Sequence, residues 1–122
     1  MFSSVECMVS WATATIGVRC GTQVPRGASG VAEGGAFLVV TRTGGELDYP
    51  HDAPRLAVQT WARSEADAEA LANQVAIALR TMPPTDAHVN HVGVPSVLSY
   101  GRQDGGWYVW QVDVGLGVNL LD

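Results

Sequence analysis

The stretch that decides the fold covers residues 37–79 and reads FLVVTRTGGELDYPHDAPRLAVQTWARSEADAEALANQVAIAL. Its pattern predicts a strand, a Gly-Gly turn, a loop over 46–54, a second strand that ends at Trp61 and a helix that begins at Ser64. No part of it arranges side chains in a way that could carry out chemistry. It is typical of a scaffold with a long loop at one corner, which favours a structural or assembly role over catalysis.

The strand over 36–43 is apolar on both of its alternating faces, which predicts a central place in a sheet. The helix over 64–82 has the clearest signals in the chain. Ser64 can cap it, and Asp67 adds negative charge at the positive end of the helix dipole. Two prolines at 83–84 end it. Its apolar stripe comprises Leu71, Val75, Ala78, Leu79 and Met82.

Outside this stretch, residues 4–15 carry apolar side chains at helical spacing, and Gly17 is a plausible stop for a short helix. Residues 18–24 predict an extended segment. The Gly-rich segment 25–35 predicts a flexible connection that is long for a loop inside a compact domain.

The C-terminal third predicts two more strands joined by a tight turn. Pro95 interrupts the first, over 91–100, and therefore predicts an edge strand or a bulge. An Asp-Gly-Gly turn follows within 102–106. The last strand, 107–119, alternates cleanly but is about twice the usual length of ~5–6 residues. We expect it to project beyond the domain or to curve at its glycines.

Together these elements predict one domain over 1–122 of the α+β class. The expected sheet is antiparallel or mixed and has about four strands. The main helix packs on one of its faces, and a short helix stands at the N-terminus.

Composition narrows the function classes. The net charge is −5, charged residues make up only 16% of the chain, and Lys is absent. Scattered arginines without a basic cluster argue against binding to nucleic-acid phosphates. Few charges indicate either an apolar surface that a partner covers or a Gly- and Thr-rich surface that needs none, and we favour the partner. Two cysteines do not indicate a disulfide framework. No signal peptide or membrane span is expected.

Two polar clusters could in principle carry chemistry. Asp86, His88 and His91 have a spacing that could bind a metal, but they follow two prolines, and exposed loop histidines explain them better. Asp48, His51 and Asp52 could act as acids and bases, but no nucleophile or cofactor motif accompanies them. We therefore assign no catalytic, cofactor-binding or metal-binding residue, and we expect the protein not to be an enzyme.

Several motifs occur in a set order. V-x-R-x-G-G (40–45) precedes D-x-P-R-L (52–56), which is followed by Trp61-Ala62 and an Ala-rich helix. The chain ends with a hairpin that closes on an aromatic strand. With this order the chain resembles the tail terminator (minor tail, or tail completion) proteins of long-tailed bacteriophages, particularly those that infect actinobacteria. The resemblance covers about residues 4–119, except that 18–35 has no specific match.

The resemblance implies a homo-oligomeric ring, most often a hexamer. Such a ring caps the tail tube, ends tail polymerisation and offers a surface to the head-tail connector, or stopper, protein. DNA passes through its lumen without specific binding. It implies a place in the virion, in the tail or neck, after assembly in the host cytoplasm. We expect the ring-forming and lumen-lining parts to be the 25–35 and 44–54 loops and the last strand. The candidate interface residues are Arg42, Gly44, Gly45, Glu46, Asp48, Tyr49, His51, Asp52 and Arg55.

Two alternatives remain open. The chain could be a neck, head-closure or tail tube subunit, and a tube subunit would polymerise into open stacks instead of stopping at one ring. It could also be a small cytosolic enzyme or ligand-binding domain that uses the Asp48, His51 and Asp52 loop. That alternative predicts a monomer or dimer with a concave pocket and an activity sensitive to His51→Ala.

Overall fold

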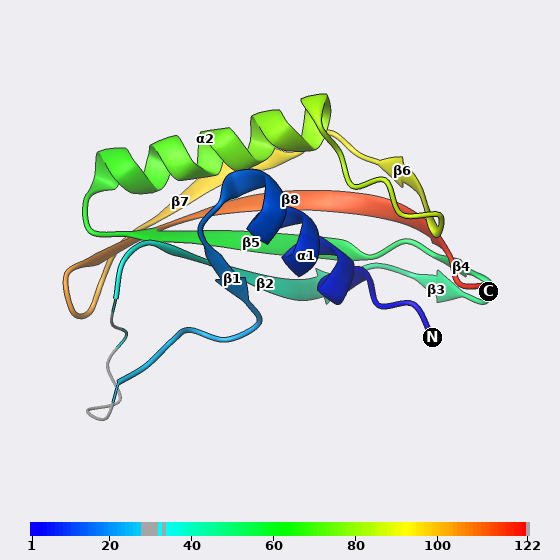
Figure 1. Cartoon of the computed structure of the whole chain (residues 1–122), viewed down its shortest axis with the longest axis horizontal. Coiled ribbons are helices and arrows are strands. Elements are labelled where there is room, and N and C mark those ends of the chain that lie inside the picture. Colours follow the sequence, from blue (N-terminus) through cyan, green and yellow to red (C-terminus); the bar gives the residue numbers. More distant parts are fainter. Residues whose placement is uncertain (28–31, 33, 122) are drawn as a thin grey trace.

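The computed structural model describes residues 1–27, 32 and 34–121. Figure 1 shows the helices lying against one face of a long, twisted sheet. Both chain ends lie near the β3–β4 end of the sheet. The elements in chain order are α1 (Ser4–Ile16), β1 (Arg19–Gly21), β2 (Phe37–Gly44), β3 (Leu47–Asp48), β4 (His51–Asp52), β5 (Arg55–Ala62), α2 (Glu65–Thr81), β6 (Val89–Val92), β7 (Ser96–Gln103) and β8 (Trp107–Asn119).

The predicted α+β class is confirmed, and the sheet is mixed because β1 runs parallel to β2 while the other pairs are antiparallel. The expected number of about four strands is wrong, since the described residues alone form a sheet of eight. The additional strands arise at two places in the chain. The predicted 46–54 loop contains the short strands β3 and β4, which extend β2 and β5 as the bent tip of one long hairpin. The predicted strand over 91–100 is divided into β6 and β7.

The long last strand, β8, lies at the centre of the sheet. Along its first part it pairs with β5 on one side and β7 on the other, and its final residues pair with β4 and β6. The expectation that this strand projects beyond the domain is therefore wrong. Its neighbours on both sides break at the level of Gly115, whose carbonyl accepts the N–H of Gly93 at 2.8 Å. The sheet bends at this level, and Figure 1 shows β8 arching over its length.

One face of the sheet carries the main hydrophobic core. Alternate residues of β2, β5 and β8 point towards the helices, as period-two alternation requires. Met8 and Ala12 of α1 meet them, together with the stripe of α2. Ser64 accepts the N–H of Asp67 and so caps α2 as expected, while Met82 lies exposed beyond its last turn, so this member of the predicted stripe is wrong. The sheet residues of this core are Leu38, Val40, Leu56, Val58, Val112, Val114, Leu116 and Val118.

The opposite face is not covered by either described helix, and it divides into two halves. At the β1 end, Phe37, Trp61 and Trp107 form an aromatic cluster, and the Trp107 indole N–H donates to the carbonyl of Ala32 at 3.2 Å. Away from this end the face is polar, with Gln59, Gln111 and Asp113 joined by side-chain hydrogen bonds. The aromatic cluster explains why the 36–43 strand is apolar on both sides.

That same strand, β2, is not central as predicted. Its outer neighbour is β1, which pairs only with residues 37–39, and no described strand pairs with the outer side of residues 40–44. On the far side of the sheet, β7 pairs with β8 alone, in agreement with the expected edge strand. Neither described helix is long and apolar enough to cross a membrane.

Candidate functional site

Arg42 holds the bend of the β2–β5 hairpin together. Its guanidinium donates to both carboxylate oxygens of Asp52 at 2.9 Å and to the carbonyls of Gly44 and Gly45 at 3.0 and 3.1 Å. Hydrogen bonding to Asp52 raises the pKa of Arg42 above its ordinary value. Arg42 and Asp52, both in the predicted interface set, therefore form an internal clamp, in which Asp52 is buried and Arg42 keeps part of its side chain exposed.

The glycines of the predicted set allow this bend. Gly45 has a φ of +102°, in the region that favours glycine. A Cβ at Gly45 would collide with the carbonyl oxygen of Ala53 and lie 2.9 Å from the backbone nitrogen of Arg55. The neighbouring Glu46 carbonyl accepts the N–H of Ala53 at 2.9 Å, which closes the bend. The sequence placed these residues on a loop surface, whereas the structure packs their backbones against each other.

The tip of the hairpin is the exposed part of the predicted set. Asp48, Tyr49 and His51 lie there with their side chains in solvent. Leu47, which the sequence-based set omitted, is 57% exposed beside Tyr49 at 59%. The Leu120 N–H donates to the Pro50 carbonyl at 2.8 Å, so the end of the chain braces the tip. The tip therefore presents apolar and aromatic side chains on a fixed backbone.

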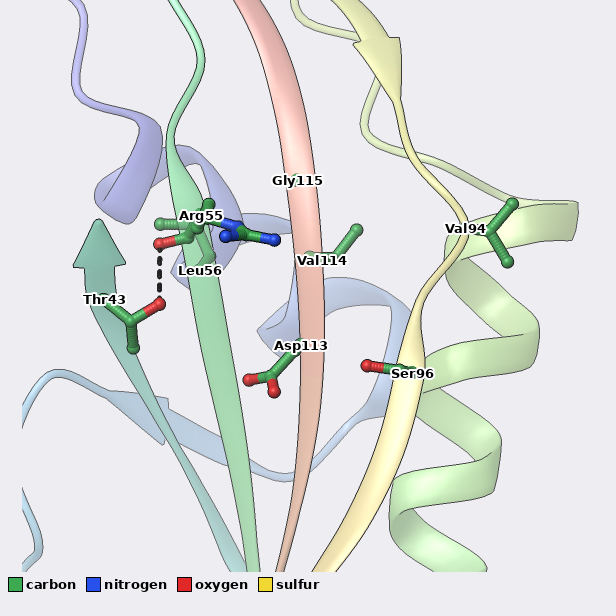
Figure 2. Close-up of a pocket in the computed structure, with 8 residues that line it drawn as sticks. All are labelled: Thr43, Arg55, Leu56, Val94, Ser96, Asp113, Val114 and Gly115. Carbon is green, nitrogen blue, oxygen red and sulfur yellow. Dashed lines mark hydrogen bonds between the residues drawn. The ribbon is translucent and has the colours of Figure 1, made fainter. Parts of the chain in front are cut away.

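Arg55 belongs to a different surface. It lines a hollow of about 400 Å³ along the bend, together with residues from three other strands. Figure 2 shows Thr43 of β2, Arg55 of β5, Asp113 of β8 and Ser96 of β7 around this hollow. The Thr43 hydroxyl donates to the Arg55 carbonyl at 3.3 Å. The lining contains Ser96 and Asp113 but neither His nor Cys.

The edge strand β7 forms a third surface, which the sequence-based set missed. Val94, just before the strand, is 77% exposed, and Val97 and Tyr100 within it are 37% and 50% exposed. Exposed apolar residues along an unpaired strand edge are a site for pairing with another chain. The sequence contained a usable signal, because Pro95 marked an edge and large apolar residues flanked it.

The polar residues over 86–91, which the sequence suggested as a possible metal site, make contacts with nearby residues or lie exposed. The His88 ring nitrogen Nδ1 lies 3.0 Å from Asp86, and Phe2 stacks on the His88 ring. Hydrogen bonds from the backbone and ring of His88 lower the pKa of the Asp86 carboxyl. His91 lies exposed on β6. Within residues 1–27, 32 and 34–121, no group of three or more His, Cys, Asp or Glu could hold a metal ion.

Both cysteines are free thiols and half-buried. Burial raises the pKa of Cys20 to about 11, and burial together with the charge of Asp86 raises that of Cys7. Both thiols are therefore protonated at neutral pH and poorly suited to act as nucleophiles.

No protein-family model matches this chain, and no curated protein matches it at a significant level.

Proposed function

We propose that this protein is a structural virion subunit, a tail terminator that closes into a homo-oligomeric ring, with six copies as the expected number. The ring caps the tail tube, ends its polymerisation and presents its other side to the head-tail connector. DNA passes through its lumen without specific binding. The protein assembles in the host cytoplasm and ends in the tail or neck of the virion.

The observation that carries the proposal is the presence of two separate exposed apolar surfaces on one small domain. One is the β2–β5 hairpin, whose tip exposes Leu47 and Tyr49, and the other is the β7 edge, with Val94, Val97 and Tyr100. A ring needs two different patches on every subunit, because each copy contacts its two neighbours head to tail. A dimer with two-fold symmetry needs only one patch.

The charge distribution also supports this role. The chain has a net charge of −5 and no Lys, and charged residues make up 16% of it. An acidic protein without a basic groove does not retain DNA by its phosphates. The helix-free face is polar but sparsely charged where Gln59, Gln111 and Asp113 are hydrogen-bonded together.

The enzyme alternative has less support. Its proposed acid, Asp52, already binds Arg42 through both carboxylate oxygens. Asp48 and His51 lie exposed at the tip, and the polar hollow along the bend is lined by other residues.

The native mass of the purified protein, measured by light scattering or native mass spectrometry over a concentration series, tests the proposal. We expect one discrete species of about six subunits of 12.9 kDa that does not grow at high concentration. Open-ended polymers would instead identify a tube subunit. A mass of one subunit at every concentration would contradict a self-closing ring.

A further inference from the structure

The sheet has two open edges, and they lie on opposite sides of the domain. On one side β7, eight residues long, pairs only with β8. On the other side β1 covers residues 37–39 of β2 and leaves the outer side of residues 40–44 without a described partner strand. Unpaired edges of this kind leave backbone N–H and C=O groups available to another strand.

The directions of these two edges are complementary. Each step from β2 to β5, from β5 to β8 and from β8 to β7 is antiparallel. Three reversals leave β7 running opposite to β2. When a second copy is placed beside the first with its strands in the same orientation, its β2 therefore meets β7 in the antiparallel sense. A rotation about an axis along the strands brings every following copy into the same arrangement.

We propose that β7 of one subunit pairs antiparallel with residues 40–44 of β2 in the next subunit, so that one continuous sheet runs around the ring. This inference rests on the proposed ring and names the contact that closes it. The occupant of each edge is a second copy of this chain, because the same molecule carries both halves of the contact. Val97 and Tyr100 lose exposed apolar surface in this pairing, which adds to the backbone hydrogen bonds.

Strand register predicts which side chains meet across the contact. Thr41 pairs with Ala57, Ala57 with Asp113, and Asp113 with Ser96, so Thr41 and Ser96 point to the same helix-free face. Residues two positions further along, Thr43 and Leu98, share that face by alternation. Directly opposite residues in an antiparallel pair have Cα atoms ~4.5–5.5 Å apart, which is within reach of a disulfide.

Disulfide trapping tests the contact directly. After Cys7→Ser and Cys20→Ser, the four combinations of Ser96→Cys or Leu98→Cys with Thr41→Cys or Thr43→Cys sample neighbouring registers. Under a mild oxidant, at least one combination is expected to give a ladder of covalent oligomers that stops at the ring size. Ser96→Cys combined with Gln74→Cys, an exposed residue of α2, is the matched control and is expected to stay uncrosslinked.

A charge substitution gives an independent test. Val97→Lys with Tyr100→Lys places two lysines on the β7 edge, a device that blocks edge pairing. We expect the ring to require at least about tenfold more protein, while circular dichroism and the melting temperature remain close to wild type. Ile77→Lys with Met82→Lys, at exposed apolar residues outside β7, is expected to leave the ring intact.

The outcomes separate the contact from the function. If the wild type forms a ring, no combination crosslinks and the edge lysines have no effect, then the edge contact is wrong and the ring stands. If the control lysines break the ring while the edge lysines do not, the contact lies elsewhere. If the wild type never exceeds one subunit, both the ring and its edge contact are overturned.

Discussion

The two ends of the β2–β5 hairpin are held by different forces. At the base, Phe37 and Trp61 stack with ring centroids 5.2 Å apart, and Trp107 packs edge-on against both. At the bend, the ion pair of Arg42 and Asp52 and a few backbone hydrogen bonds hold the two strands together. Apolar packing resists salt, whereas a partly exposed ion pair is screened by it. The base of this hairpin is therefore expected to keep its stability as the salt concentration rises, whereas the stability of the bend is expected to fall.

The largest expected effect is at the base. Trp107→Ala removes a fully buried side chain, its hydrogen bond to Ala32 and its contact with the Arg63 guanidinium, which lies 3.8 Å above the ring. We expect the free energy of unfolding to fall by about 3–5 kcal/mol in denaturant titrations. Tyr100→Ala, at an exposed aromatic residue of the monomer, is the control. Equal losses in the two variants, measured on the monomer, would show that the aromatic cluster contributes no more to stability than an exposed aromatic residue does.

At the bend, Gly45→Ala is expected to cost about 2–4 kcal/mol, because it combines a strained φ with a collision against Ala53. Gly17→Ala is the matched control. Gly17 also has a positive φ, of +81°, but nothing lies within 4 Å of its Cβ position. We therefore expect only the conformational cost there, about 1–2 kcal/mol. If thermal or chemical unfolding gives the same loss for both, close packing at the bend is not what requires glycine.

The clamp itself is expected to have a smaller effect. Arg42→Met leaves the buried Asp52 carboxylate without its main partner and should cost about 1–3 kcal/mol. Partial exposure of Arg42 keeps the loss moderate. A double-mutant cycle with Asp52→Asn measures the coupling between the two groups. We expect the coupling to shrink as salt rises, while the loss in Trp107→Ala stays constant. A coupling of zero would show that the two residues act independently.

The smallest effect is a pH dependence at the base, where Cys20 pairs with Leu38 of β2. Its pKa is raised from 9.0 to about 11 in the folded state by burial. The unfolded thiol therefore loses its proton first, and the stability present below pH 9 declines between pH 9 and about pH 11. Cys20→Ala is expected to flatten this part of the stability curve. An unchanged slope in that variant would assign the decline to other groups.

Sequence patterns correctly predicted the elements whose bounds depend on interactions between residues close together in the chain. Ser64 and the two prolines at 83–84 set the bounds of α2, because capping and loss of an N–H act within one turn. Alternation gave β8 its length and the face that packs on the helices. Pro95 correctly indicated an edge strand, although the division into β6 and β7 was not predicted, and the Asp-Gly-Gly sequence indicated the turn before Trp107.

The short strands, the order of strands in the sheet and the exposed edge depend on pairing between distant parts of the chain, which local sequence patterns do not reveal. The two-residue strands β3 and β4 exist because His51 and Asp52 lie beside Asn119 and Val118, more than sixty positions later. The predicted interface set was contiguous in sequence, yet the structure distributes it over a clamp, a tip and a hollow. The exposed β7 edge lay outside that set, since exposure depends on which strands take which side of β8.

The central position of β8 also bears on how the chain is made. It is the last element in the sequence, yet β4, β5, β6 and β7 all pair with it. A ribosome therefore exposes every other strand before the one that organises them emerges. Until residues 107–119 are free, β5 and β7 have edges open to other chains, and during this interval the nascent protein is exposed to aggregation through those edges.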